Sequence, residues 1–467
     1  MLDQHRTPLF DALRNYAARV RAPLHIPGHK MGRAAAADWR SFMGDQALSL
    51  DQTEAPGLDD LHAPEGVIAE AQALAAEAFG AERSFFLVGG TTAGLHTLIL
   101  SACRPGDTVA VPRHAHRSVL GALVLSGARP SWMRVKFHEE LDIATQLNIE
   151  SLKGAIQGAS AALLVHPTFY GIAGSIKEEI NAIHERNLPV LVDEAHGTHF
   201  AFHPALPPPA LALGADGVVQ STHKTGGSLT QSSMCHLGHG SRLTEHRVRA
   251  MLRLVQSTSP SYVLMASLDM ARREMAVHGH AAWDGAIELA TKARHRISAL
   301  SGIRIHETSD PTKLIIDLRG RGWFGFHAAD ELWSSGVAVE SAGLGYVLAV
   351  LTPGDTYETV SVLEDAIRNL PQGPGAPPPP PEPPWPDVVM TPRDAFLGET
   401  ETVRLADAQG RIAAELVAPY PPGIPVVAPG ERLTADVVAY LRHAAATGCH
   451  LQGPADATLH TIQVVKE

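Results

Sequence analysis

Short apolar segments alternate with helical stretches along much of the chain, starting near residue 65. This alternation predicts an α/β fold whose large domain has a mainly parallel sheet with both faces covered. The expected strands are Ser84–Val88, Thr108–Val111, Ala161–Val165, Pro189–Val192 and Gly217–Gln220, and the expected helices are Gly66–Phe79, Thr92–Cys103 and His116–Ser126. Ligands of such sheets bind beyond the carboxyl ends of the strands, so the residues that follow each strand are the first candidates for a site.

The length of 467 residues is enough for about three domains. Residues 1–60 are expected to form an N-terminal arm with one amphipathic helix, Pro8–Val20, and residues 61–300 form the large domain. Residues 301–370 predict a small α+β domain. Its expected strands are Thr312–Leu318, Val337–Val339 and Tyr346–Leu351, and its expected helices are His327–Ser335 and Tyr357–Asn369.

A proline-rich segment, residues 371–387, marks the clearest boundary in the chain and includes five consecutive prolines from Pro377 to Pro381. Consecutive prolines favour an extended chain and cannot continue a helix or a central strand. We therefore expect a semi-rigid linker, with a peptide-docking role as the alternative. Residues 388–467 then predict a C-terminal α+β domain with one helix, Thr434–Ala446.

The composition excludes several classes of function. A formal net charge of -11 argues against nucleic acid and anionic membranes as partners. No apolar run approaches the roughly 18 residues of a membrane span, and the first residues lack the order of a signal peptide. Cys103, Cys235 and Cys449 lie far apart without a CxxC motif, and the 25 histidines are scattered without an HExxH motif. We expect a cytoplasmic globular protein with neither a disulfide framework nor a metal site.

A lysine and an aspartate follow two of the expected strands. Lys224 lies in Ser221-Thr-His-Lys-Thr225, and Asp193 begins Asp193-Glu-Ala-His-Gly197. A lone lysine after a strand usually faces solvent, and a buried carboxylate is often explained by a salt bridge. The two residues together have a well-known joint use. The lysine forms a Schiff base with pyridoxal phosphate (PLP), and the carboxylate holds the pyridine nitrogen protonated.

Residues near two other strand ends could hold the phosphate of this cofactor. Gly89-Gly-Thr-Thr-Ala-Gly94 follows a strand and opens a helix, where backbone amides and threonine hydroxyls can bind an anion. Glycine pairs at such turns are common, so this signal is weak by itself. Ser221 and His223 flank Lys224 and could reach the same phosphate.

Further candidates surround the expected ring of the cofactor. His116 could stack on the ring or transfer a proton, although a histidine near a helix N-terminus often has no such role. Thr168 could hydrogen-bond the phenolic oxygen, or it could serve only as a turn residue or cap. Ala195 leaves space for a flat ring, and His196 lies beside it in the same segment.

The chain resembles the Orn/Lys/Arg decarboxylase family of fold-type I PLP enzymes, and within it the short bacterial arginine decarboxylases. The motifs that carry the resemblance are His25-Ile-Pro-Gly-His-Lys30, Leu58-Asp-Asp-Leu-His-Ala-Pro64, Asp193-Glu-Ala-His-Gly197, Ser221-Thr-His-Lys-Thr-Gly-Gly-Ser-Leu-Thr-Gln231, Thr352-Pro-Gly-Asp355 and Met390-Thr-Pro-Arg-Asp-Ala-Phe396. They span nearly the whole chain, including its C-terminal domain.

The resemblance implies a role for each candidate residue. It makes Lys224 the Schiff-base lysine and Asp193 the partner of the pyridine nitrogen, and it places His116 on the ring face. It places Gly90, Thr91, Thr92, Ser221 and His223 around the phosphate. It also implies a homodimer or higher oligomer with active sites at the subunit interface.

The expected reaction is decarboxylation of a basic amino acid, with arginine converted to agmatine and CO2. Glu340, with Asp59 and Asp60 as weaker candidates, would receive the distal cation, because guanidinium favours a bidentate carboxylate. Two departures from the family concern this pocket. The segment Glu340-Ser-Ala-Gly-Leu-Gly345 keeps only the acidic residue where an acidic residue and a tyrosine are expected, and the loop Glu307-Thr-Ser-Asp310 looks shorter than in arginine-specific relatives.

Other functions stay open at this point. Lysine or ornithine could be the substrate in place of arginine. Ser-x-His-Lys also occurs in cysteine desulfurases and some acyltransferases, but no cysteine here lies in an evident mobile loop, and an aminotransferase would need a carboxylate-binding arginine in a matching context. A non-catalytic PLP-binding regulatory subunit is a further alternative, which the altered Ser341–Gly345 segment motivates.

Overall fold

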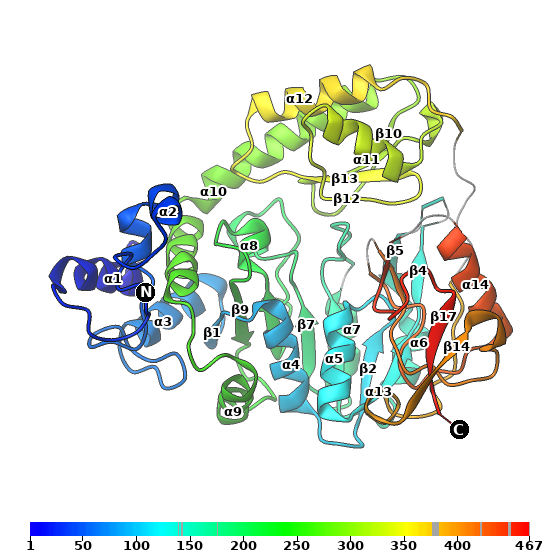
Figure 1. Ribbon diagram of the computed structural model, residues 1–467, viewed down its shortest axis with the longest axis horizontal. Coiled ribbons are helices and arrows are strands. Elements are labelled where there is room, and N and C mark those ends of the chain that lie inside the picture. Colours follow the sequence, from blue (N-terminus) through cyan, green and yellow to red (C-terminus); the bar gives the residue numbers. More distant parts are fainter. Residues whose placement is uncertain are drawn as a thin grey trace. The chain divides into compact units, whose positions relative to one another are not determined.

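The computed structural model describes residues 1–138, 140–141, 143–174, 176–375, 383–420, 423–446 and 450–466. The chain forms two compact units (Figure 1). The first unit contains Met1–Ser101 and Pro189–Ala281, and the second contains Ala102–Leu188 and Ala282–Glu467. Much of the expected proline-rich linker, and Cys449, lie outside the described residues.

The first unit contains four strands in the order β1-β9-β8-β7. Its elements are α1 (Pro8–Arg19), α2 (Ala37–Ser49), α3 (Val67–Phe79), β1 (Arg83–Leu87), α4 (Gly90–Ala102), β7 (Val190–Asp193), β8 (Gly217–Gln220), α8 (Thr222–Thr225), β9 (Ser233–Leu237), α9 (Glu245–Val255) and the first part of α10 (Tyr262–Ser298). Strands β7 and β8 are parallel, whereas β9 runs antiparallel to both β8 and β1. All residues of β7 and β8 are buried, as the continuous apolar runs predict for strands covered on both faces.

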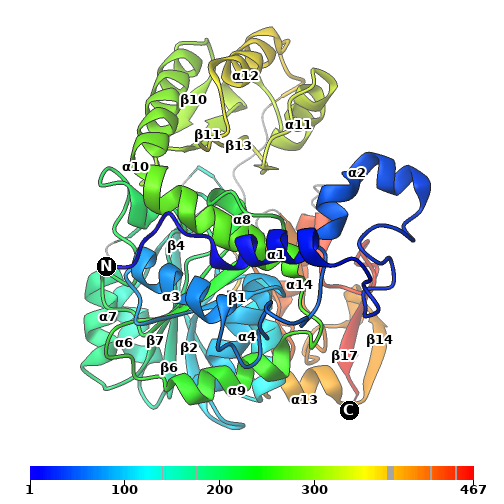
Figure 2. The same cartoon turned by 90° about the vertical axis from the view of Figure 1, so that its left-hand side faces the viewer.

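Helix α1 is held to α10 by hydrogen bonds to Asp269, and the two helices lie side by side in Figure 2. Asp269 and Arg272, one turn apart on α10, are fully buried with their charged atoms 2.8 Å apart. Asp269 accepts hydrogen bonds from the backbone N–H groups of Leu9 (3.0 Å) and Phe10 (3.4 Å) at the start of α1. These N–H groups have no partner inside the helix, so the carboxylate serves as their acceptor.

The second unit begins with the parallel strands β6-β2-β3. Its elements before α10 are β2 (Thr108–Pro112), α5 (Arg117–Ser126), β3 (Arg129–Met133), β4 (Val135–Phe137), β5 (Ala144–Leu147), α6 (Ile149–Ala155), β6 (Ala161–Val165) and α7 (Ile176–His184). A four-stranded antiparallel sheet follows, in the order β10-β11-β13-β12. Its strands are β10 (Arg304–His306), β11 (Lys313–Asp317), β12 (Ser341–Ala342) and β13 (Tyr346–Val350), with helices α11 (Gly325–Ser334) and α12 (Tyr357–Asn369).

The C-terminal part of this unit has its own apolar core, built around residues such as Val417, Leu441 and Ile462. Its elements are α13 (Pro392–Leu397), β14 (Thr400–Arg404), β15 (Ala418–Tyr420), α14 (Ala435–Ala446), β16 (His450–Gln452) and β17 (Thr461–Val465), and the strands form two antiparallel pairs, β14 with β17 and β15 with β16.

The sequence prediction of a strand at Val337–Val339 is wrong. These residues follow the end of α11, and the N–H of Val337 donates back to the carbonyl of Leu332, which closes the helix. The partner of β13 is instead Ser341–Ala342. The strand Ser233–Leu237 and the helix Ala37–Ser49 were not predicted.

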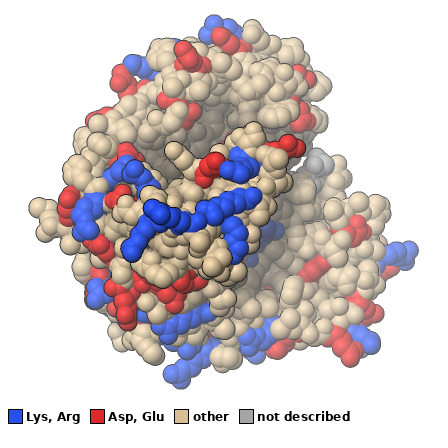
Figure 3. All heavy atoms as spheres, turned by 60° about the vertical axis from the view of Figure 1, so that its left-hand side comes forward, with Lys and Arg blue, Asp and Glu red and all other residues tan. Residues whose placement is uncertain are grey.

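No helix among the described residues is both long and apolar enough to cross a membrane. Acidic and basic side chains are interspersed among uncharged residues over the face shown in Figure 3. The net charge of -11 therefore does not form a single acidic field on that face.

Candidate functional site

Lys224 lies in α8, the single helical turn that follows β8. Its Nζ is 2.7 Å from Nε2 of His196, which lies in the segment after β7. Because β7 and β8 are parallel neighbours, with Asp193 paired to Val219, their carboxyl ends meet at one edge of the sheet. The structure thus brings together the two sequence segments from which the site was predicted.

Asp193 is 94% buried at the end of β7, since only 6% of its surface is exposed. Its Oδ1 accepts a hydrogen bond of 3.2 Å from the N–H of Ala195. Burial raises the pKa of Asp193, whereas the positive charge of Lys224 and the Ala195 N–H lower it. A buried carboxylate in this position is stabilised by a positively charged N–H partner, which a protonated pyridine nitrogen provides.

The turn before α4 supplies hydroxyl groups beside α8. Gly90 begins α4 with a φ of +71°, a conformation that glycine adopts without strain. The Thr91 hydroxyl lies 2.5 Å from that of Ser221 and 3.1 Å from that of Ser233. Thr92 follows in the first turn of the helix and is exposed. Hydroxyls and free N–H groups at a helix N-terminus are suited to a phosphate.

His223, next to Lys224, is half-buried. Burial lowers its pKa, and the charge of Lys224 lowers it further, which favours the neutral imidazole. A neutral imidazole still carries one N–H that can donate to an anion. Ser233 is the residue that sequence reasoning missed here, because only the return of β9 alongside β8 brings it next to Thr91.

The functional groups of these side chains fit PLP. Lys224 offers a primary amine for the aldehyde, Asp193 offers a buried carboxylate for the ring nitrogen, and Thr91 and Ser221 offer hydroxyls at a helix N-terminus for the phosphate. Ala195 is buried and adds only a methyl group to the segment between Asp193 and His196.

Two predicted cofactor residues belong to the second unit, where each has local contacts. His116 is the N-cap of α5, and its Nδ1 accepts from the N–H of Ser118 (3.3 Å) and lies 2.8 Å from the Ser118 hydroxyl. These contacts fix the orientation of the imidazole ring. Thr168 is buried, and its hydroxyl accepts from the N–H of Ile172 at 3.3 Å, as expected for a turn residue.

The predicted substrate residues have different surroundings. The Asp59 carboxylate accepts hydrogen bonds from five backbone N–H groups, those of Asp60, Glu65, Gly66, Ile68 and Ala69, at 2.8–3.3 Å. Partial burial raises the pKa of Asp59, but these donors outweigh it and the pKa lies below its ordinary value. Asp59 thus caps the start of α3. Asp60 accepts from the N–H of His62 at 2.8 Å, and Glu340, in the second unit, is exposed.

The altered segment Ser341–Gly345 is shaped by Tyr346. A Cβ atom at Gly343 would lie 2.2 Å from the Tyr346 ring, so a larger residue at 343 and this ring exclude one another. The Tyr346 hydroxyl donates to that of Tyr170 at 2.8 Å. Tyr170 lies two residues after Thr168, and this bond therefore links the altered segment to the turn that holds Thr168.

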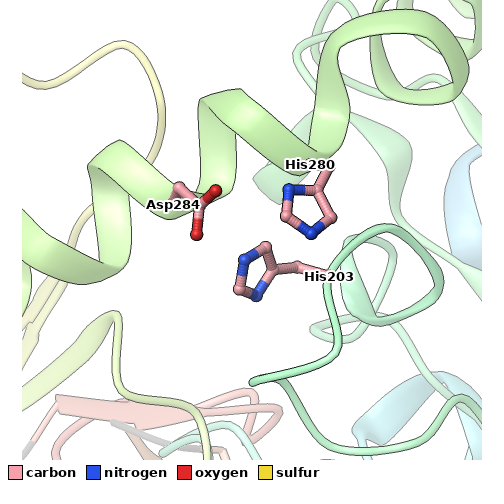
Figure 4. A group of neighbouring side chains, drawn as sticks. All are labelled: His203, His280 and Asp284. Carbon is pink, nitrogen blue, oxygen red and sulfur yellow. The ribbon is translucent and has the colours of Figure 1, made fainter.

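A separate group of polar side chains, His203, His280 and Asp284, is shown in Figure 4. The centroids of the two imidazole rings are 4.7 Å apart, and Asp284 follows one turn after His280 on α10. No sequence motif marks this group, because His203 comes from a loop far from α10 in the chain.

A lysine and a buried aspartate at adjacent strand ends, on strands that are mostly parallel, define the class of protein: a PLP-dependent enzyme of fold type I. Residues 7–336 match the family model for the Orn/Lys/Arg decarboxylase major domain, and residues 383–461 match the C-terminal domain of the same family. The chain therefore belongs to the Orn/Lys/Arg decarboxylase family, and it is a PLP-dependent decarboxylase.

Known proteins resemble this chain over its whole length. An arginine decarboxylase of Bacillus subtilis (strain 168) is 40% identical, over 100% of this chain and 99% of that protein. An arginine decarboxylase of Bacillus anthracis is 39% identical, over 100% and 98%. Among solved structures, the constitutive lysine decarboxylase of Escherichia coli has a TM-score of 0.84 at 20% identity, covering 100% of this chain and 82% of that one. This last likeness concerns the fold.

Proposed function

We propose that this chain decarboxylates arginine to agmatine and CO2. The single observation that carries the chemistry is the placement of Lys224 and the buried Asp193 at the ends of adjacent parallel strands. The choice of arginine is supported by the identity of about 40% to arginine decarboxylases over the full chain.

PLP, when bound, supplies an electron sink for the electrons of the bond between Cα and the carboxylate. Lys224 would hold the aldehyde carbon of the cofactor through its amine. Asp193 holds the proton on the ring nitrogen, a charge stabilisation aimed at the transition state. The phosphate is held by Gly90, Thr91, Thr92, Ser221 and His223, and Ala195 and His196 lie beside the ring.

His116 packs against the ring and returns a proton to Cα, and Thr168 donates to the phenolic oxygen. Support for the role of His116 comes from its ring orientation, which the contacts of Nδ1 with Ser118 fix at the N-terminus of α5.

Glu340 receives the guanidinium group of the substrate through a bidentate contact. It is exposed within its own unit, so its carboxylate can reach a ligand. Asp60 is the second choice. Asp59 is the weakest of the three, because its oxygens already accept five backbone hydrogen bonds.

Lysine or ornithine is the alternative substrate. The observation that favours it is the Gly343–Tyr346 contact, since a reshaped segment near Glu340 could alter the length of side chain that the pocket accepts. A non-catalytic, PLP-binding role is the remaining alternative.

The protein works as a homodimer or a higher oligomer in the cytoplasm, with active sites at the subunit interface. Support comes from the N-terminal arm, residues 1–60, which exposes large apolar side chains. Leu24 is 92% exposed and Phe42 82% exposed, and Trp39 stacks on Phe42 with a centroid distance of 6.2 Å. Isolated apolar side chains are common on surfaces, but two exposed aromatic rings stacked on one another are suited to a contact, here with a second copy of the chain. After this arm we propose a large domain, a small α+β domain, a linker and a C-terminal domain, which comprise residues 61–300, 301–370, 371–387 and 388–467.

The test is to incubate the purified protein with PLP and with arginine, lysine or ornithine, and to measure CO2 and amine products. Agmatine from arginine as the dominant product would support the proposal. Cadaverine or putrescine would keep the chemistry and overturn the substrate. No CO2 from any of the three, from a protein that binds PLP, would overturn the catalytic role.

A further inference from the structure

A line of buried polar side chains crosses the sheet of the first unit and ends beside Asp193. Glu194 is fully buried, and its Oε1 accepts from the N–H of Ala210 at 2.7 Å. Its Oε2 accepts from the amide nitrogen of Gln220, also at 2.7 Å. The Gln220 amide oxygen lies 3.2 Å from Nε2 of His236, and Nδ1 of His236 lies 2.7 Å from the Ser84 hydroxyl. The four side chains come from β1, β9, β8 and the end of β7.

These contacts fix every proton when Glu194 is ionised. The Gln220 amide nitrogen donates to the carboxylate, so its oxygen must accept, and the donor available to it is a proton on Nε2 of His236. Nδ1 of His236 is then an acceptor, and the Ser84 hydroxyl donates to it. Burial lowers the pKa of His236 to about 3, which keeps the ring neutral. All donors in the line therefore point toward the charge on Glu194.

The same line can also hold a neutral Glu194 with the direction of each hydrogen bond between its side chains reversed. The carboxylic acid must donate the proton on Oε2 to an acceptor. The Gln220 side-chain amide can flip by 180°, which places its oxygen next to Oε2 to accept this proton. The Gln220 nitrogen then donates to Nε2 of His236, the proton of the ring moves to Nδ1, and Ser84 turns to accept it. One proton is taken up at Glu194, none is lost elsewhere, and every hydrogen bond reverses direction.

The balance between these two states lies near neutral pH. Burial raises the pKa of Glu194 to about 8, although the N–H of Ala210 and the amide of Gln220 lower it. The titratable groups around this carboxyl are Asp193, the preceding residue, and His236 on β9. The negative charge of Asp193 disfavours ionisation of Glu194. Because the coupling is mutual, the negative charge of an ionised Glu194 disfavours ionisation of Asp193 to the same extent.

We propose that Glu194 is a positioning residue for Asp193, and that the reversible line from Glu194 to Ser84 sets the charge beside the carboxylate that holds the cofactor nitrogen. This rests on the proposed role of Asp193. When Glu194 is ionised, its negative charge makes the proton between Asp193 and the ring nitrogen harder to remove. When Glu194 is neutral, that proton is lost more easily.

The test compares the wild-type holoenzyme with E194Q. A glutamine at 194 keeps both contacts, since its oxygen accepts from Ala210 and its nitrogen donates to a turned Gln220. The readout is the pH titration of the visible absorbance of the bound cofactor, measured without substrate. The titration midpoint of E194Q should lie lower by about one pH unit, the size expected for the loss of one buried negative charge. An unchanged midpoint would overturn the proposal.

Two further variants keep the result interpretable. E415Q removes a buried carboxylate that also accepts hydrogen bonds from two backbone N–H groups, those of Ala455 and Gln463, and its absorbance titration should match the wild type. D193N tests the premise. If D193N leaves the cofactor spectrum unchanged, the role of Asp193 fails independently of Glu194.

A measurement on the wild type covers the case in which E194Q does not fold. The infrared difference spectrum between samples at pH 6 and pH 9.5 should contain the carbonyl stretch of a buried carboxylic acid that disappears at high pH. The absence of this band from the wild-type protein would contradict the two-state line.

Discussion

Glu431, near the C-terminus, forms an ion pair with Arg113, three residues before His116, and both side chains are almost fully buried at 1% and 5% exposure. Arg113 Nη2 donates to Glu431 Oε2 at 2.9 Å and to the carbonyl of Val426 at 2.7 Å. Its guanidinium stacks on the ring of Trp132 at 4.7 Å. The C-terminal segment therefore reaches the carboxyl end of β2, the strand that leads to His116.

Replacing Glu431 by alanine should lower the free energy of unfolding by about 3–5 kcal/mol, because it leaves a buried guanidinium without its partner. Urea denaturation would measure this change. The control is D407A, which breaks an exposed pair with Arg404 at 78% and 54% exposure and should cost less than about 1 kcal/mol. Equal effects of the two variants would contradict the account of this contact.

Gly94 lets α4 lie close to β8. A Cβ atom there would be 2.4 Å from Cγ1 of Val219 and 2.8 Å from Cδ1 of Leu87. G94A should therefore cost about 1–3 kcal/mol of stability. It should also weaken PLP binding in an equilibrium titration, since a shift of α4 separates Thr91 from Ser221.

The matched control is G285A, on the exposed side of α10, where an added methyl group meets nothing within 4 Å. It should be neutral or stabilising by up to about 1 kcal/mol, because alanine favours a helix over glycine. If G94A behaved like G285A, the close approach of α4 to β8 would be refuted.

Asp317, on β11, gives the four-stranded antiparallel sheet a defined response to acid. Burial alone would raise its pKa, but hydrogen bonds from His306 (3.1 Å) and Arg319 (2.7 and 3.0 Å) hold the pKa far below its ordinary value of 3.8. A carboxyl group with a lowered pKa in the folded state stabilises the fold above the unfolded value, and this contribution is lost as the pH falls below it.

D317N should therefore destabilise the protein by about 2–3 kcal/mol at pH 7. The gap between the wild type and D317N should narrow below pH 4, because Asp317 takes up a proton there in the unfolded wild-type chain while it stays ionised in the folded one. Unfolding free energies measured between pH 3 and pH 7 test this, and a gap that did not change with pH would count against the assignment.

The sequence predicted the elements whose pattern is local. Strands β7 and β8 are short apolar runs, and the observed bounds differ from the predicted ones by one residue at most. The strand β9 escaped prediction because Ser233–Leu237 has no alternation, and it is defined by pairing with β8 and β1. The false strand at Val337–Val339 had the right residue types, but the N–H of Val337 is used to close α11.

In the candidate site, too, features with a local sequence pattern could be predicted and features that depend only on strand pairing could not. Lys224 and Asp193 follow strands in the sequence, so their meeting at one sheet edge could be predicted from parallel pairing. The line of Glu194, Gln220, His236 and Ser84 could not be predicted, because its members are single polar residues on three strands and directly after a fourth. Asp59 was predicted to bind the substrate because of its negative charge. Only the structure reveals that its carboxylate already accepts hydrogen bonds from five backbone N–H groups.

The central claim is that Lys224 holds the cofactor, and one measurement tests it directly. The holoenzyme is reduced with borohydride, which makes the bond between lysine and cofactor permanent, and its peptides are examined by mass spectrometry. The account predicts that the pyridoxyl group is found on Lys224 and that K224A acquires no such label. A label on another lysine, such as Lys313, or no label on a PLP-loaded protein, would contradict it.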